Sequence, residues 1–217
     1  MISTPLELYA EGLLVERAAT EPAYTSWLRY TDGRRLLLDV PRWIAPASAA
    51  DEHLLSLCTG PTLDIGCGPG RLTRALVARG TICLGVDVAP EAVAMASTGG
   101  MPVLHASIFD RVMDDSLWAT VLLADGNIGI GGDPVALLSR ARDLCTGNLL
   151  VEVDGPTTVT ARVQVRIETS TGRESHWFPW AHVSATDVPR VAADAGLTVR
   201  TAWCAEDRWF AELVASC

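Results

Sequence analysis

A glycine-rich loop in the first third of the chain has the spacing of a cofactor-binding loop. It runs G-x-G-x-G, with Gly66, Gly68 and Gly70, and follows a short apolar segment. Glycines let a backbone approach a ligand closely, because a Cβ would obstruct the ligand or forbid a positive φ. Dinucleotide-binding loops run G-x-G-x-x-G, so their third glycine would stand where this chain has Arg71. The early third glycine, with Asp64 just before the loop, favours a ligand without a pyrophosphate.

A second acid has the spacing of a ribose ligand. Asp87 lies about 20 residues beyond the glycine loop, at the end of the next apolar segment. An acid at this distance can accept hydrogen bonds from both ribose hydroxyls. Proteins that bind NAD use an acid in the same way, so Asp87 indicates a ribose rather than one particular cofactor. The alternative is that Asp87 caps the helix that begins near Pro90.

Five acids and histidines in the second half of the chain are candidate general bases. Asp125 follows an apolar segment and precedes a loop with four glycines. Glu152 and Asp154 end the next apolar segment and, two residues apart, would face the same side of a strand. His176 and His182 lie in a segment that we expect to fold over the site. Each could instead be structural: Glu152 by pairing with an arginine, the histidines as surface residues.

The elements that must position these residues alternate between strand and helix. Strands are predicted over residues 62–65, 82–87, 103–107, 120–124 and 148–154, and helices over 71–79, 90–96 and 134–144. This alternation predicts a parallel sheet with helices on both faces. Ligands of such sheets bind beyond the carboxyl ends of the strands, which is where the candidate residues lie.

The two ends of the chain add elements to this core. An N-terminal preface is expected to hold a helix over 5–19, two short strands within 27–39 and a helix over 47–57. After the core, residues 159–167 alternate between apolar and polar side chains, with a return strand expected over 174–178, a helix over 184–195 and a strand pair over 197–204 and 209–214. We expect one domain over residues 1–217, divided into a preface (1–57), a cofactor-binding core (58–154), a lid-like hairpin (155–183) and a C-terminal helix with a strand pair (184–217).

These motifs and their order resemble the class I S-adenosylmethionine (SAM)-dependent methyltransferases over residues 61 to about 154. The resemblance implies an α/β fold with a Rossmann-like doubly wound sheet of seven strands, mostly parallel with an antiparallel final strand. It implies SAM as the cofactor. The loop at 125–133 and the Leu-Asp-Val-Pro-Arg-Trp segment before it, at residues 38–43, are similar to a small actinobacterial group.

The resemblance also implies which residues contact the cofactor: Asp64, Gly66, Cys67, Gly68, Gly70, Asp87, Val88, Ser107, Ile108, Asp125 and Gly126. Asp64 would lie near the methionine end of SAM, and Ile108 would flank the adenine. Ser107 stands where the family often has an acid that contacts the adenine amino group. Asp110 or a backbone carbonyl is therefore expected to replace that contact.

Composition and aromatic residues indicate which kind of molecule would receive the methyl group (the acceptor). The net charge of −9 disfavours nucleic acid, which needs a basic face. Trp177, Phe178 and Trp180 cluster in the hairpin, and tryptophan faces suit sugar rings or flat aromatic molecules, although core packing is the alternative.

We expect O-methylation of a small neutral acceptor, a sugar or oligosaccharide being one option, with an Asp, Glu or His base. N- or C-methylation of a small metabolite, a non-catalytic SAM-binding protein and an NAD-dependent oxidoreductase are the alternatives. The oxidoreductase could not use a Tyr-x-x-x-Lys pair, because the chain has no lysine.

The remaining features indicate a cytoplasmic protein. The six cysteines form no C-x-x-C and have no zinc spacing, so we expect free thiols in a reducing compartment. The N-terminus lacks the basic start of a signal peptide, and no apolar run reaches the roughly 20 residues of a membrane span. Asp125, Asp154 and His182 could converge on magnesium, but spacing alone does not support a metal, and none is expected. The outer face of the hairpin could pair with a second copy, giving a homodimer.

Overall fold

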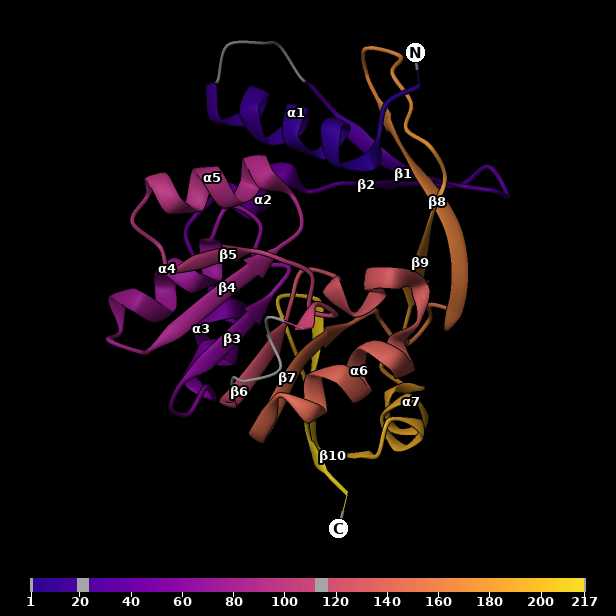
Figure 1. Ribbon diagram of the computed structural model, residues 1–217. Helices are drawn as coiled ribbons and strands as arrows, with labels where there is room; N and C mark the ends of the chain where they lie inside the picture. Colours follow the sequence, from indigo (N-terminus) through magenta and orange to yellow (C-terminus); the bar gives the residue numbers. More distant parts are fainter. Residues whose placement is uncertain (1, 19–23, 112–116, 217) are drawn as a thin grey trace.

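Two β-sheets organise the chain (Figure 1). The computed structural model describes residues 2–18, 24–111 and 117–216. The larger sheet has seven strands and carries the helices of the α/β core. The smaller sheet has four strands and lies over one edge of the larger sheet, beside helix α1 (Pro5–Ala18).

The seven-stranded sheet confirms the fold that the sequence predicted. Its strands are β3 (Thr62–Ile65), β4 (Cys83–Asp87), β5 (Val103–His105), β6 (Trp118–Leu123), β7 (Cys145–Val153), β10 (Leu197–Ala205) and β11 (Arg208–Ala215), in the order β10-β11-β7-β6-β3-β4-β5. The core strands pair in parallel, and β11 runs antiparallel to both of its neighbours. This arrangement is the predicted mostly parallel sheet that ends in a reversed strand.

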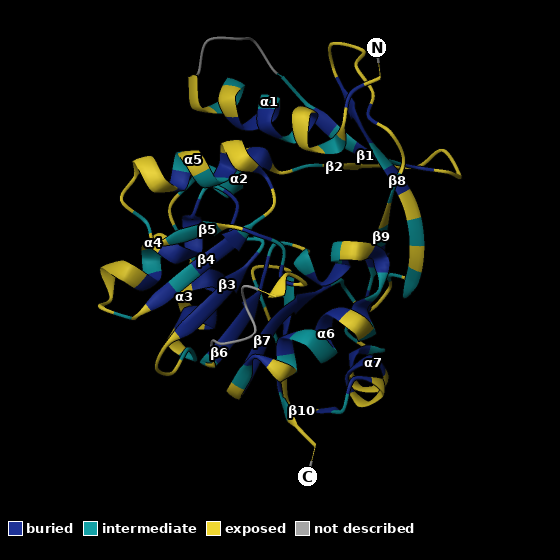
Figure 2. Cartoon of the chain, in the orientation of Figure 1, coloured by how far each residue is buried: buried dark blue, intermediate teal, exposed yellow. Residues whose placement is uncertain are grey.

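Helices cover both faces of the large sheet, because side chains along each central strand alternate between the two faces. Val121 and Leu123 of β6 pack with α6 (Pro134–Asp143) and α7 (Val188–Asp194). Leu122 packs on the opposite face with α3 (Ala49–Ser56) and α4 (Arg71–Ala78). The central strands are buried on both faces (Figure 2). Burial of this kind explains their continuous apolar sequence.

The four-stranded sheet is an element that the sequence did not predict. It joins β2 (Arg35–Leu37), β1 (Ser26–Tyr30), β8 (Ala161–Thr169) and β9 (Phe178–His182), in that order and all antiparallel. The preface hairpin and the hairpin after the core thus form one sheet, because β1 pairs along β8 with Leu28 opposite Ile167. The return strand expected over 174–178 is wrong in position: β9 begins where the expected strand ends.

Helices α1, α2 (Val40–Ile44) and α5 (Pro90–Thr98) pack together beside the glycine loop. Leu13 of α1 and Val40 of α2 form an apolar cluster with Ala89 and Ala92. Helix α2 was not predicted from the sequence. It is short and begins after Asp39, whose carboxylate accepts a hydrogen bond from the Arg42 N–H. The helix expected over 184–195 begins only at Val188.

In the part of the chain that the structure describes, no helix is long and apolar enough to cross a membrane.

Candidate functional site

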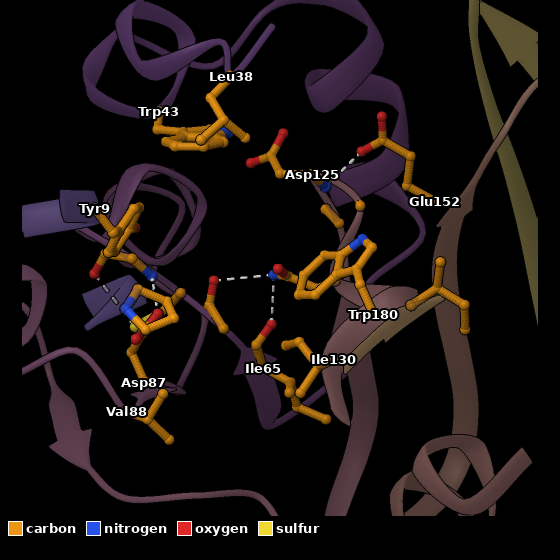
Figure 3. A pocket seen from close by; sticks show the side chains of 18 of the residues that line it. Tyr9, Leu38, Trp43, Ile65, Asp87, Val88, Asp125, Ile130, Glu152 and Trp180 are labelled. Atoms are coloured by element: carbon orange, nitrogen blue, oxygen red, sulfur yellow. Dashed lines mark hydrogen bonds between the residues drawn. The ribbon is translucent and has the colours of Figure 1, made fainter. Parts of the chain in front are cut away.

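A cavity of about 770 Å³ lies between the carboxyl ends of the parallel strands and the inner face of the four-stranded sheet. The glycine loop and Asp87 line one part of it. Asp125, Asp154 and His182 line another part. Figure 3 shows Tyr9 and Asp87 on one side of the cavity and Trp180 with Ile130 on the other. Most of the predicted site residues therefore share one cavity.

The glycine loop has the backbone that its sequence predicts. Gly66 and Gly68 have φ of +69° and +54°, in the region that L side chains rarely adopt. A Cβ at Gly66 would lie 2.6 Å from the side-chain nitrogen of Asn127, and one at Gly68 would lie 2.8 Å from the Tyr9 hydroxyl. The Asn127 amide donates to the carbonyls of Ile65 and Gly66, at 2.8 and 2.9 Å. The glycines are thus required by the protein's own packing as well as by any ligand above them.

Two carboxylates flank the loop, and burial raises the pKa of both. Asp87 accepts hydrogen bonds from the backbone N–H groups of Gly68 and Ala89, each at 2.8 Å. Asp64 is fully enclosed and accepts a bond from the Thr73 hydroxyl at 2.8 Å. Burial raises the pKa of Asp64 to about 6. Burial disfavours the ionised form of each acid, and a cationic group placed beside them would favour it again.

The residues that follow β4 and β5 also line this part of the cavity. They are Val88, directly after β4, and Ser107 and Ile108, in the loop after β5. Asp110, expected as a substitute contact for the adenine, does not line the cavity. Its carboxylate instead accepts the Ser107 N–H at 2.8 Å, which shapes the turn.

Asp125 and Glu152 belong to a network of arginine–carboxylate pairs. Arg71, at the start of α4, donates to Asp125 at 2.7 and 2.9 Å and also contacts the fully buried Asp51. Arg208 of β11 pairs with Glu152 at 2.7 Å and with Asp51 at 2.7 Å. Glu152 also accepts the backbone N–H of Asp125 (Figure 3). Arginines therefore occupy both carboxylates, and a neutral hydroxyl would compete poorly for their oxygen atoms.

The network also explains the backbone at Asp125. This residue has a φ of +56°, which is uncommon outside glycine. Arg42 of α2 approaches the same carboxylate at 3.2 Å. Arg208 lies 3.4 Å from it as well. Three arginines thus hold the Asp125 turn in a conformation that costs energy on its own.

Asp154 and His182 form a different kind of pair. The Nδ1 of His182 lies 3.0 Å from Oδ1 of Asp154, whose other oxygen accepts the Val183 N–H at 3.0 Å. The Nε2 of His182 lies 2.7 Å from the hydroxyl of Tyr30. With an ionised Asp154, Nδ1 carries the proton and Nε2 is the basic nitrogen. Burial first, and the Asp154 charge second, raise the pKa of Tyr30, so its hydroxyl is a donor.

Two predicted site residues lie elsewhere. His176 is exposed and does not line the cavity; its backbone N–H donates to Ser3. Gly70 is the left-handed N-cap of α4 and does not line the cavity. Cys67 and Gly126 do line the cavity. Within the described residues, no group of three or more acids, histidines or cysteines could hold a metal ion.

Four residues of the site were not predicted as site residues from the sequence: Tyr9, Tyr30, Arg42 and Arg71. Arg71 carried a signal, since an arginine at the start of a buried helix requires carboxylate partners. Tyr9 and Tyr30 carried none, because their contacts depend on how the preface packs on the core. The hydrogen bond between Tyr30 and His182 joins positions 152 residues apart in the sequence.

Residues 63–116 match the family model described as a methyltransferase domain. Among solved structures, a SAM-dependent methyltransferase from Bacteroides fragilis, in complex with S-adenosyl-L-homocysteine, is similar over 99% of this chain and 96% of that one. The TM-score is 0.81, at 16% identity. The CcbJ methyltransferase from Streptomyces caelestis covers 81% of this chain and 92% of its own (TM-score 0.62, 15% identity). The glycopeptide N-methyltransferase MtfA covers 79% and 97% (TM-score 0.60, 13% identity). No curated protein matches the chain.

The similarity to the methyltransferase domain covers residues 63–116, and the whole chain has the fold of SAM-dependent methyltransferases. Methyltransferases of this fold use SAM as the methyl donor. The lining of the cavity is compatible with SAM: it includes the glycines of the loop, Asp87 and the buried Asp64.

Proposed function

We propose that this protein transfers a methyl group from SAM to the hydroxyl of a small neutral acceptor, with His182 as the general base. The observation that carries the proposal is the His182–Asp154 pair, at 3.0 Å, on the wall of the cavity that also holds the glycine loop. A histidine oriented by a carboxylate is a common form of general base.

Two groups of residues would hold the cofactor. Asp87 would accept hydrogen bonds from the ribose hydroxyls, while Gly66 and Gly68 leave room for the chain of the ligand. Asp64 would face the ammonium group, and Ile108 the adenine. When bound, SAM supplies an electrophilic methyl group on a positively charged sulfur.

The proposed step needs one proton acceptor. The acceptor oxygen forms a bond to the methyl carbon as the carbon–sulfur bond breaks, and the electron pair of that bond stays on sulfur. The hydroxyl proton passes to Nε2 of His182. Asp154 keeps Nδ1 protonated and stabilises the imidazolium that forms.

In the structure, the Tyr30 hydroxyl is hydrogen-bonded to Nε2 of His182, the nitrogen that would take the proton from the methyl acceptor. His182 lines the cavity, whereas Tyr30 does not, so the acceptor would displace the Tyr30 hydroxyl from Nε2. Replacing Tyr30 by phenylalanine should lower the acceptor KM by about fivefold, the worth of one neutral hydrogen bond, and leave kcat nearly unchanged. Steady-state kinetics would measure both. A large loss of kcat would instead mean that Tyr30 itself relays the proton.

Calorimetric titration tests the cofactor part of the proposal. SAM should bind the wild-type protein and NAD should not. Asp87→Ala should weaken SAM binding by about 10- to 100-fold, the worth of a hydrogen bond to a charged group. Glu91→Ala, an exposed acid on α5 outside the cavity, is the matched control and should leave the affinity unchanged. NAD binding without SAM binding would overturn the proposal.

An acceptor scan that follows S-adenosylhomocysteine release tests the transfer itself. Alcohols, phenols and sugars form the first set. Amines form the second, because MtfA, which shares the fold, is named an N-methyltransferase. SAM binding without turnover on any acceptor would favour a non-catalytic SAM-binding protein.

A further inference from the structure

We propose that the acceptor carries an apolar alkyl or aryl body behind its hydroxyl, and that this body lies along the four-stranded sheet and leaves the cavity past Leu36 and Leu37. The proposal rests on the proposed function of the same site. It selects a chemical class of acceptor and disfavours polyols and anions.

The inner face of the four-stranded sheet is an apolar wall. Leu28 of β1, Ile167 of β8, and Phe178 and Trp180 of β9 all line the cavity from this sheet. They share a face because residues two apart on a strand point the same way. Ile130 lies beside Trp180 and extends this apolar wall (Figure 3). His182, at the end of β9, adds a basic nitrogen beside this wall, so a hydroxyl at that nitrogen would have its attached body against apolar side chains.

The mouth of the cavity exposes leucines that the fold itself does not use. Leu36 and Leu37 of the edge strand β2 are 47% and 58% exposed, and both line the cavity. Leu6 of α1 lines it too and is 39% exposed. Edge strands usually carry charges rather than adjacent leucines, since apolar edges promote aggregation. An exposed apolar patch continuous with a catalytic cavity is best explained by a ligand that covers it.

The charged groups on the cavity wall disfavour an anionic acceptor. Arg42 and Arg71 are the arginines that line the cavity among the residues that the structure describes. Arg42 contacts Asp125 at 3.2 Å and Arg71 contacts it at 2.7 Å. A phosphate or carboxylate would have to break these pairs. A polyol would have to leave most of its hydroxyls against leucine, isoleucine and tryptophan, which costs free energy for each unmade hydrogen bond.

Binding of 4-alkylphenols to the protein saturated with S-adenosylhomocysteine tests the proposal. Calorimetry would compare the methyl, propyl and hexyl compounds, with methyl glucoside as the polyol probe. Each added methylene that enters the cavity should tighten binding by about fourfold. Methyl glucoside should bind more weakly than any of the three. Binding that does not depend on alkyl length, or that favours the glucoside, would overturn the proposal.

A variant at the mouth separates this site from general hydrophobic binding. Leu37→Asn should reduce the gain from the outer methylenes and leave the affinity for 4-methylphenol unchanged. Leu14→Asn, which changes a leucine 52% exposed on α1 outside the cavity, should leave the whole series as in the wild type. An unchanged series in Leu37→Asn would contradict the proposed path.

The two proposals fail in different ways. The alkylphenol series measures binding and needs no turnover. Absence of S-adenosylhomocysteine binding would contradict the proposed function. Normal S-adenosylhomocysteine binding with no dependence on alkyl length would contradict the acceptor class alone.

Discussion

Replacing His182 by glutamine should lower kcat for methyl transfer to a hydroxyl by about 10²- to 10⁴-fold, the usual contribution of a general base. Glutamine can still hydrogen-bond to Asp154 but cannot accept a proton at neutral pH. The affinity for SAM should stay within about twofold, because His182 lies on the four-stranded sheet and not on the glycine loop. Single-turnover kinetics at saturating SAM, with calorimetry for the cofactor, would measure both effects.

His176→Gln is the matched control for this experiment. His176 is six residues earlier in the same segment, but its side chain is exposed outside the cavity, so the variant should behave as the wild type. Equal kcat values for the wild type and His182→Gln would rule out His182 as the base. Asp154→Asn should lower kcat less than His182→Gln, because Asp154 positions the imidazole and does not take the proton.

The sequence predicted the part of the cavity wall around the glycine loop because that part is local. Asp64, the glycines and Asp87 each stand at the carboxyl end of a strand or in the loop that follows it. Their positions are set by strand–loop–helix units of about 20 residues. Apolar runs such as 120–124 marked the buried strands, and the parallel sheet follows from the alternation of elements.

The part of the cavity wall around His182 and Asp154 depends on contacts between distant parts of the chain. The sheet β2-β1-β8-β9 joins the preface to residues more than 120 positions later, and no turn signal specifies this pairing. His182 meets Asp154 only because β9 ends at His182; a shift of one residue would turn its side chain to the other face. From the sequence alone, Asp125, Glu152, Asp154 and two histidines were alternative candidates. Their different contacts, arginines for Asp125 and Glu152 and a histidine for Asp154, appear only in the folded chain.

Replacing Asp51 by asparagine should destabilise the protein by about 3 kcal/mol, at the low end of the range for removing one partner of a buried ion pair. Asp51 is fully buried between Arg71 and Arg208. Asparagine keeps the size of the side chain but removes the charge. The cost stays at the low end because both arginines still have a carboxylate partner in the variant, Arg71 with Asp125 and Arg208 with Glu152. Thermal unfolding should show a Tm lower by about 6–12 °C for a chain of this length.

Glu52→Gln is the control at the neighbouring position. Glu52 also pairs with an arginine, Arg79, but its side chain is 56% exposed. An exposed pair contributes less than about 1 kcal/mol, so this variant should unfold close to the wild-type temperature. Equal stabilities for Asp51→Asn and Glu52→Gln would contradict the importance of the buried network.

The dependence of stability on pH separates the charge of Asp51 from its role as a helix cap. Burial opposes ionisation of Asp51, but hydrogen bonds from Arg71, the Ser48 backbone and Arg208 outweigh it and lower the pKa to about 2, from 3.8. A lowered pKa stabilises the fold above pH 3.8, and most of this contribution, about 2 kcal/mol, is lost as the pH falls to 2. The difference in stability between the wild type and Asp51→Asn should therefore shrink over that interval.

Ser48→Ala, which removes the hydroxyl that accepts the Asp51 N–H in the capping box, should cost about 1 kcal/mol at every pH. A difference that stayed constant from pH 5 to pH 2 would mean that Asp51 acts through capping and not through its charge.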